Sequence, residues 1–227
     1  MKILLAAFGT RGDVQPMVAL GTRLRADGHD VAIGASAAFA EWVRGHGLKF
    51  HAVGHDIEPW IRTHGDMLEP SLRSIRTTIE YLREDAELSF DQTYAASRGV
   101  DLIVSGAHAA AASVAEVLGV PHRTLLFCPQ AVPSRFHPPP GVQRFSLPGW
   151  GNHLAWTLAL GAFDFILKGT INRRRAAWRF PGIAGVSRYL IGGDSIVASD
   201  AVLGELPPDA PQGMVQTGAL ELSADGP

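Results

Sequence analysis

The feature that most constrains the fold is an alternation of short apolar runs with segments of helical periodicity. This alternation is typical of a parallel sheet covered by helices on both faces. Seven runs are expected to be strands, at about Lys2–Ala7, Val31–Ile33, Lys49–Val53, Asp101–Ser105, His122–Cys128, Ser195–Ser199 and Met214–Thr217. The sequence therefore predicts one α/β domain over residues 1–220, with a doubly wound, mostly parallel, Rossmann-like sheet. The polar tail 221–227 is expected to begin a linker.

Helices are expected between these strands, and some of the connections are longer than the repeat requires. The predicted helices are about Val14–Ala26, Ala37–His46, Pro70–Ser97, Ala109–Leu118 and a long one from Trp150 to about Arg179. Three segments interrupt the economical repeat: the connection Gly54–Pro70, the long helix Pro70–Ser97 and the proline-rich stretch that leads into the last helix, Gln130–Phe165. Such excursions are usually functional, so we expect them to converge above the carboxyl ends of the strands and wall an apolar pocket. The alternative is that their aromatic residues pack into the core.

Composition excludes several classes of protein. Hydrophobic residues make up 46% and charged residues 19% of the 227 residues, which is a globular composition. Twenty basic residues nearly balance 22 acidic ones, so no nucleic-acid partner is expected. The apolar run at Met1–Phe8 is too short for a signal peptide, and Leu154–Leu167, interrupted by Asp164, is expected to be unable to span a bilayer. With Cys128 as its single cysteine, the chain is expected to be a soluble cytoplasmic protein.

The first turn between a strand and a helix, Gly9-Thr10-Arg11-Gly12-Asp13, is the main candidate for chemistry. In an open α/β sheet this turn lies at the carboxyl end of a strand, where ligands bind. Two glycines let the backbone approach a ligand closely, and the following helix directs free N–H groups toward it. The alternative is that the glycines only shape the turn and Asp13 caps the helix. A dinucleotide site is discounted, because the G-x-G-x-x-G pattern and an acidic residue after the second strand are both missing.

Other catalytic signals are weak. The nine histidines are scattered, without the spacing of metal ligands, so no metal site is expected. The chain has neither a G-x-S-x-G elbow nor a G-x-x-x-x-G-K phosphate loop.

The segment Gly9-Thr10-Arg11-Gly12-Asp13-Val14-Gln15-Pro16 resembles the opening motif of GT-B-fold glycosyltransferases. These are the enzymes that decorate glycopeptides, macrolides and other natural products, together with sterol glucosyltransferases. Further similarities follow in order at Asp101–Val104, Gly119–Pro121, Cys128–Pro129, Leu147–Asn152 and Leu206–Asp209. The resemblance covers nearly all of the chain but only the N-terminal, acceptor-binding domain of the family.

The resemblance implies transfer of a sugar from a nucleotide-sugar donor to an acceptor hydroxyl, with inversion and without a cofactor or metal. Asp13 would be the general base, while Gly9, Thr10, Arg11 and Gly12 would lie near the donor diphosphate. Relatives with a histidine base often pair it with an aspartate after the fourth strand. Here that place holds Ser105–His108, without a carboxylate, which is compatible with Asp13 acting alone. A separate C-terminal domain would bind the donor, so this chain alone is expected to be inactive.

The acceptor, a small molecule, is expected to contact a set of mostly apolar residues, Trp60, Met67, His108, Phe136 and Trp150. For His108 the alternative is a solvent-exposed position at a helix N-terminus. For the apolar stripe Trp150–Phe165 the alternatives are core packing and contact with a membrane surface. A second hypothesis makes the chain a stand-alone acceptor-binding or partner subunit, active only with a separate donor-binding chain.

Overall fold

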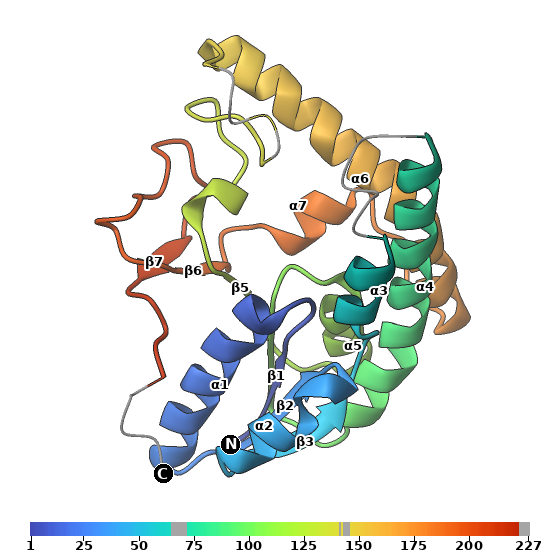
Figure 1. The fold of residues 1–227 in the computed structure, drawn as a ribbon, viewed down its shortest axis with the longest axis vertical. Coiled ribbons are helices and arrows are strands. Elements are labelled where there is room, and N and C mark those ends of the chain that lie inside the picture. The colour runs from blue at the N-terminus through green and yellow to red at the C-terminus, as the bar shows by residue number, and fades with distance from the viewer. Residues whose placement is uncertain (65–71, 141, 143–145, 223–227) are drawn as a thin grey trace.

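A computed structural model describes residues 1–64, 72–140, 142 and 146–222, and its centre is a sheet of seven strands in the order β3-β2-β1-β4-β5-β6-β7 (Figure 1). Every described strand pair is parallel, so the predicted α/β class is confirmed and the described sheet is parallel throughout. The strands are β1 Lys2–Ala6, β2 Asp30–Ala35, β3 Lys49–Ala52, β4 Leu102–Ser105, β5 His122–Leu126, β6 Ile196–Ala198 and β7 Val215–Thr217.

Helices cover both faces of the sheet, with α1 on one side and α4 and α5 on the other (Figure 1). The α-helices are α1 Arg11–Ala26, α2 Ala40–Gly45, α3 Ile57–His64, α4 Leu72–Ala96, α5 Ala109–Leu118, α6 Gly149–Ala177 and α7 Val186–Leu190. Short 3-10 helices lie at Ala37–Phe39 and Pro129–Ala131. The helix α6 packs against α4 and α7, and α4 packs against α5, so these helices form one layer.

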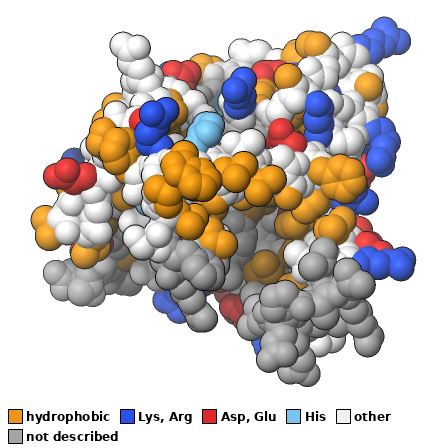
Figure 2. Space-filling view, turned by 90° about the horizontal axis from the view of Figure 1, so that it is seen from above, with side chains coloured by type: hydrophobic (Ala, Val, Ile, Leu, Met, Phe, Trp, Pro, Cys, Tyr) orange, Lys and Arg blue, Asp and Glu red, His pale blue; other side chains and the backbone are white. Residues whose placement is uncertain are grey.

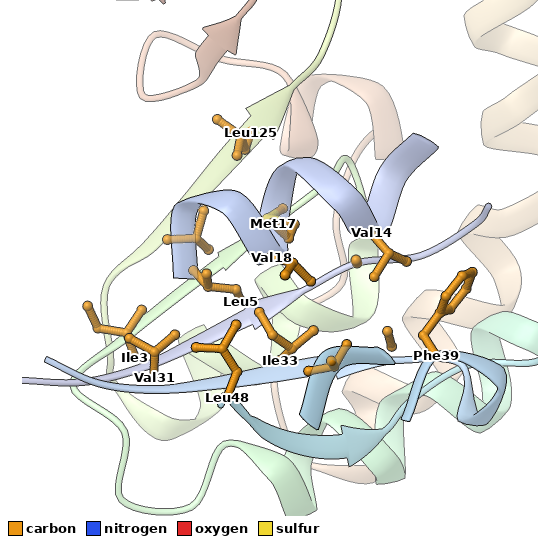
Figure 3. Packing of buried hydrophobic residues seen from close by; sticks show 14 of the residues in the cluster. Ile3, Leu5, Val14, Met17, Val18, Val31, Ile33, Phe39, Leu48 and Leu125 are labelled. Carbon is orange, nitrogen blue, oxygen red and sulfur yellow. The ribbon is translucent and has the colours of Figure 1, made fainter. Parts of the chain in front are cut away.

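The core follows from the alternation of side chains along β1. Ile3 and Leu5 lie on the α1 side, where they belong to one buried cluster with Met17 and Val18 (Figure 3). Leu4, between them, belongs to a second cluster with residues of α5 on the other face. A strand with both faces buried reads as a continuous apolar run, which is why β1 resembles a signal sequence in composition.

The strand order contains one reversal of direction, between β1 and β4. From β1 the chain builds outward to β2 and β3, then returns to place β4 on the other side of β1. The loops after β1 and β4 therefore diverge at their carboxyl ends. In open α/β sheets this is the position where ligands bind.

Some of the observed elements differ from the sequence expectation. The helix α1 begins at Arg11, not at about Val14, because Thr10 and Asp13 form a capping box one turn earlier. The connection Gly54–Pro70 contains a helix, α3, whose start is stabilised by a hydrogen bond from the Glu58 N–H to Asp56 Oδ1 at 3.1 Å. Residues 223–227 of the expected linker lie outside the described residues.

Helix α6 combines an apolar composition with an exposed face. It has 29 residues and a mean hydropathy of 1.4 over its most apolar window, 22% of which is buried, so among the described helices it alone could cross a membrane by length and composition. The expectation that Asp164 excludes this was wrong on that criterion, because one acidic residue leaves the mean hydropathy high.

Asp164 Oδ1 accepts a hydrogen bond from the Val186 N–H at 2.7 Å, at the start of α7.

Candidate functional site

The turn after β1 holds Asp13 in a defined position. Thr10 is the N-cap of α1, and its main-chain N–H donates a hydrogen bond to Asp13 Oδ2 at 2.8 Å. The Thr10 hydroxyl lies 3.3 Å from the same oxygen and accepts a hydrogen bond from the Gly12 N–H at 3.3 Å. Asp13 therefore caps the helix, as the structural alternative predicted. Both Thr10 contacts use Oδ2, and in the described part of the chain Oδ1 accepts no hydrogen bond.

Gly9 is required by this arrangement. Its φ of +126° lies in a region that residues with side chains rarely adopt. A Cβ atom at this position would overlap the Asp13 carboxylate. The glycine thus allows both the turn and the close approach of Asp13 to the backbone.

Arg11 points away from the turn, toward α2. Its Nε donates to Gln15 Oε1 at 3.3 Å, and its guanidinium lies 5.0 Å from the centre of the Trp42 ring. Arg11 and Gly12 are exposed at the start of α1. The four residues predicted to lie near the donor, Gly9, Thr10, Arg11 and Gly12, thus form the rim of the turn.

Two cavities open beside this turn, at the switch in strand order. The Asp13 cavity has a volume of about 340 Å³ and is lined by Asp13, Met17, Leu125, Phe127 and Cys128, among others. The apolar cavity has a volume of about 260 Å³ and lies toward α4 and α6. Ala7, Phe8, Ala107 and His108 line both cavities and so form the wall between them.

The apolar cavity draws its wall from all three excursions named in the sequence analysis. Ile57 comes from α3, Tyr81 and Phe90 from α4, and Phe163 and Leu167 from α6. Asp13 itself is on the wall of the neighbouring Asp13 cavity.

Asp85 is a site residue that the sequence analysis missed. Its Oδ1 accepts a hydrogen bond from the His55 main-chain N–H at 2.8 Å, and its Oδ2 lies 3.6 Å from Nε2 of His108. Burial alone would raise the pKa of Asp85, but the His108 side chain and the His55 N–H together hold that pKa below its usual value. A carboxylate therefore does lie beside the end of β4, contributed by α4 and not by the loop after β4. An acidic residue within the apolar stripe of Leu82, Ala86 and Phe90 was the available signal.

His108 is not the exposed histidine of the alternative expectation. It is the N-cap residue of α5, its side chain is 17% exposed, and it lines both cavities. Its ring lies flat against Phe8, with ring centroids 3.4 Å apart. The expectation of a solvent-exposed side chain was wrong because Phe8 and Asp85 cover the ring.

The other predicted acceptor residues lie in different surroundings. Trp60 is half-buried with its ring 5.0 Å from Tyr81, which lines the apolar cavity. Phe136 and Trp150 are 61% and 74% exposed, and neither is among the described residues that line the two cavities. Met67 lies outside the described residues. Trp156, another aromatic residue of the third excursion, is buried and donates a hydrogen bond from Nε1 to the His137 carbonyl at 2.9 Å.

The described site is made of carboxylates, imidazoles and apolar side chains. Among the residues that the structure places, no group of three or more His, Cys, Asp or Glu side chains has the arrangement of a metal site. What the site offers chemically is a carboxylate, Asp13, on one cavity wall, and a carboxylate–imidazole pair, Asp85 and His108, on the other.

Together, the Rossmann-like sheet and the cavities at its switch point define a ligand-binding α/β domain. The family described as the glycosyltransferase family 28 N-terminal domain matches residues 3–134. This match covers more than half of the chain, so the chain belongs to that family. The resemblance drawn from Gly9–Pro16 is thereby confirmed.

Individual relatives agree with this assignment. Glycosyltransferase GtfC of Amycolatopsis orientalis is 33% identical over 231 residues, covering 100% of this chain and 55% of the relative. Vancomycin aglycone glucosyltransferase of the same organism is 32% identical over 235 residues, covering 100% of this chain and 55% of the relative. Sterol 3-beta-glucosyltransferase of Debaryomyces hansenii is 36% identical over 122 residues, covering 52% of this chain and 8% of the relative. The chain spans about half the length of the first two relatives.

Solved structures show the same fold. The calicheamicin glycosyltransferase CalG4 aligns with a TM-score of 0.66 at 14% identity, over 96% of this chain and 52% of that one. The glycosyltransferase of kitacinnamycin aligns with a TM-score of 0.64 at 16% identity, over 99% of this chain and 53% of that one. The fold is therefore that of about half of each of these glycosyltransferase chains.

Proposed function

We propose that this chain is the acceptor-binding half of an inverting glycosyltransferase. In this proposal the complete enzyme moves a sugar from a nucleotide-sugar donor to a hydroxyl of a natural-product or lipid-like acceptor. The observation that carries the proposal is the position of Asp13, at the carboxyl end of β1 and on a cavity wall at the switch in strand order. The relatives of this chain that act on vancomycin aglycone and on sterols support an acceptor with a bulky apolar body.

In the proposed reaction Asp13 is the general base. An alcohol is a weak nucleophile at neutral pH, and a carboxylate within hydrogen-bond reach removes its proton as the new C–O bond forms. The Thr10 N–H holds Oδ2, which leaves Oδ1 to take the proton. The acceptor oxygen attacks the anomeric carbon, the bond to the nucleoside diphosphate breaks, and a single displacement inverts the configuration. Neutralisation of the leaving diphosphate is assigned to helix N-termini and polar groups, without a metal ion.

The donor is assigned mainly to a second domain. Gly9, Thr10, Arg11 and Gly12 form the rim at the start of α1, where the helix dipole favours an anion. In this proposal they contact only the diphosphate, while the base and the ribose bind elsewhere. Calorimetry with UDP and TDP should therefore show weak or undetectable binding to the 227-residue chain. Micromolar binding of either nucleotide would contradict the assignment of donor binding to a second domain.

Transfer assays test the function directly. A chain that includes the donor-binding domain should glycosylate members of a panel of glycopeptide, macrolide, lipid and sterol acceptors with at least one nucleotide sugar. The alternative, a partner subunit that works with a separate donor-binding chain, predicts transfer only when the two chains are mixed. Failure of transfer in both formats, with every acceptor and donor, would defeat both versions.

We also propose contact of α6 with a membrane surface, as a second property of the same chain. Trp150, Leu154, Leu158 and Phe165 are 74%, 50%, 65% and 82% exposed, and their spacing places them on one face of the helix. Figure 2 shows hydrophobic side chains gathered in a band across the face seen from above. An apolar helical face with tryptophan at one end is typical of helices that lie in a bilayer interface.

Co-sedimentation with phosphatidylcholine vesicles tests this contact. The chain should sediment with the vesicles, and Leu158→Glu should abolish the binding. Val202→Glu is the matched control, because Val202 is 94% exposed but lies outside α6. Equal binding by both variants would count against the proposal.

A further inference from the structure

A third cavity lies between α6, α7 and the segment 133–135, and we call it the α6–α7 cavity. Its volume is about 650 Å³, within the range of about 300–1,000 Å³ that is typical of small-molecule sites. On α7, Val186 and Leu190 line the apolar cavity, whereas Ser187 and Arg188 line this one. Among the described residues it shares no lining residue with the apolar cavity or the Asp13 cavity, so it is a separate site.

The lining of the α6–α7 cavity carries charges of both signs. Asp209 Oδ2 lies 3.7 Å from Nε of Arg135, so these two residues form an ion pair. Asp164 and Arg188 add a second carboxylate and a second guanidinium group. The two carboxylates would repel an anion, and the two guanidinium groups would repel a cation. A neutral ligand is therefore the best match.

Some polar groups of this lining are not used within the described part of the chain. Oδ1 of Asp164 accepts hydrogen bonds at the start of α7, but Oδ2 accepts none, and the Arg188 side chain makes no hydrogen bond or ion pair there. The Ser187 hydroxyl also has no partner, yet it is not among the fully shielded unpaired atoms, so solvent reaches it. A free acceptor, free donors and a hydroxyl that does both are what neighbouring hydroxyl groups of a ligand require.

The rest of the wall includes apolar groups. Trp156 is 7% exposed and its Nε1 donates to the His137 carbonyl, so the ring offers the cavity carbon surface and not a free N–H. Leu160 lies one helical turn further along α6 and lines the same cavity. A pyranose sugar combines the matching features, because it has C–H groups on its faces and hydroxyl groups around its edge. A benzene ring fills a cavity of about 150 Å³, so there is room for one or two pyranose rings with their hydroxyl groups.

We propose that the α6–α7 cavity is a carbohydrate-binding site for a neutral pyranose sugar of one or two residues. Trp156 and Leu160 pack against a C–H face of the sugar, while Ser187, Arg188 and Asp164 hydrogen-bond its hydroxyl groups. This site goes beyond the proposed function, since it requires neither Asp13 nor sugar transfer. The sugar held here is separate from the one that is proposed to be transferred, because the Asp13 cavity lies elsewhere.

Gly161 allows the cavity to be filled without disturbing the core. It lines the cavity from the exposed surface of α6, and an added Cβ would meet nothing within 4 Å. Gly161→Leu places a side chain at the cavity and also replaces a poor helix former with a good one. Gly169→Leu is the matched control. Gly169 is exposed on the same helix with nothing within 4 Å of its Cβ, but it is not among the described residues that line the cavity.

NMR titration of the chain with methyl α-D-glucopyranoside and with maltose measures the binding. At least one of the two sugars should bind with a Kd of about 1 mM or lower and shift the indole N–H signal of Trp156. Gly161→Leu should weaken binding by about tenfold or more, whereas Gly169→Leu should stay within about twofold of the unmodified chain. Ser187→Ala removes a hydroxyl that has no partner in the described chain, so it should weaken binding about fivefold, the effect of one hydrogen bond.

Absence of binding of both sugars at about 20 mM would overturn the inference. So would equal effects of Gly161→Leu and Gly169→Leu, or tighter binding of inorganic phosphate, choline or glycine, which are an anion, a cation and a zwitterion, than of either sugar. If circular dichroism shows that Gly161→Leu is unfolded, Ser187→Ala decides, and unchanged affinity in that variant would refute the site. None of these measurements needs sugar transfer, so their failure would leave the proposed function intact.

Discussion

The main-chain N–H of Thr10 donates a hydrogen bond to Oδ2 of Asp13 at 2.8 Å, which ties the proposed catalytic carboxylate to the cap of α1. One side chain thus stabilises the start of a helix and faces a cavity at the same time. The two roles use different properties of the carboxylate. Capping needs an acceptor oxygen, whereas general base catalysis needs a group that can take a proton.

Asp13→Asn should separate these roles. The asparagine side-chain oxygen can still accept from the Thr10 N–H, so the free energy of unfolding should change by less than about 0.5 kcal/mol. The amide cannot act as a base, and the rate of transfer by the complete two-domain enzyme should fall by roughly two to four orders of magnitude. Acceptor affinity should change little. The measurements are kcat with a saturating acceptor and denaturant unfolding of the same variant.

Asp13→Ala provides the contrast. It removes the acceptor oxygen as well as the base, so this variant should lose about 1 kcal/mol of stability in addition to activity. If Asp13→Asn transferred sugar within a few-fold of the unmodified enzyme, Asp13 would be only a cap.

Gly9→Ala should damage both the turn and the position of Asp13. The φ of +126° is strained for alanine, and the added Cβ overlaps the Asp13 carboxylate, so the loss of stability should be about 2–3 kcal/mol. Gly28→Ala is the matched control, because Gly28 also has a positive φ, +88°, but its Cβ would have nothing within 4 Å. That variant should lose only about 1 kcal/mol and should transfer sugar normally. The measurements are thermal unfolding and transfer rates of the two variants. Equal values for Gly9→Ala and Gly28→Ala would rule out a role for the Gly9–Asp13 contact.

The sheet could be predicted from the sequence because its strands are buried on both faces and therefore appear as unbroken apolar runs. The sequence could not place the start of α1 so well, because the reciprocal contact of Thr10 and Asp13 appears only when the turn is built. Helix α3 was not predicted because it is short and contains Pro59. Proline usually indicates a loop, but it is tolerated in the first turn of a helix.

The site was predictable only where its residues are neighbours in sequence. Gly9 to Asp13 form one turn, so their grouping followed from local chemistry. Asp85 and His108 meet because α4 packs on α5, and helical periodicity gives the buried face of a helix but not its partner. Phe136 and Trp150 are apolar and were expected at the pocket, yet they lie exposed, since apolar composition does not distinguish a pocket wall from an exposed surface.

Asp209 joins two segments far apart in the chain, and its loss should destabilise both. Its Oδ1 accepts a hydrogen bond from Ser134 Oγ at 2.6 Å, and its Oδ2 accepts one from the Arg135 N–H at 2.9 Å. Asp209→Ala leaves the O–H of the buried Ser134 without an acceptor and should reduce the free energy of unfolding by about 1–3 kcal/mol in urea. Asp194→Ala, at a carboxylate that is 85% exposed, should stay within about 0.5 kcal/mol of the original. Equal effects of the two substitutions would show that Asp209 is not an anchor.

His122 should make the fold sensitive to mild acid. Its Nε2 lies 2.9 Å from Ser105 Oγ, and burial, reinforced by the charge of Arg123 and opposed by Glu116, lowers the pKa of His122 from 6.5 to about 4. In the unfolded chain the imidazole titrates near its ordinary value, so between about pH 6.5 and pH 4 the unfolded state binds a proton that the native state does not. Stability should therefore be fully present above about pH 6.5 and should fall by about 2–3 kcal/mol as the pH decreases to about 4. His122→Gln keeps a hydrogen-bond donor for Ser105 but cannot titrate, so its urea unfolding free energy should be flatter over the same pH interval by that amount. Parallel pH profiles for the two proteins would show that His122 does not carry the acid sensitivity.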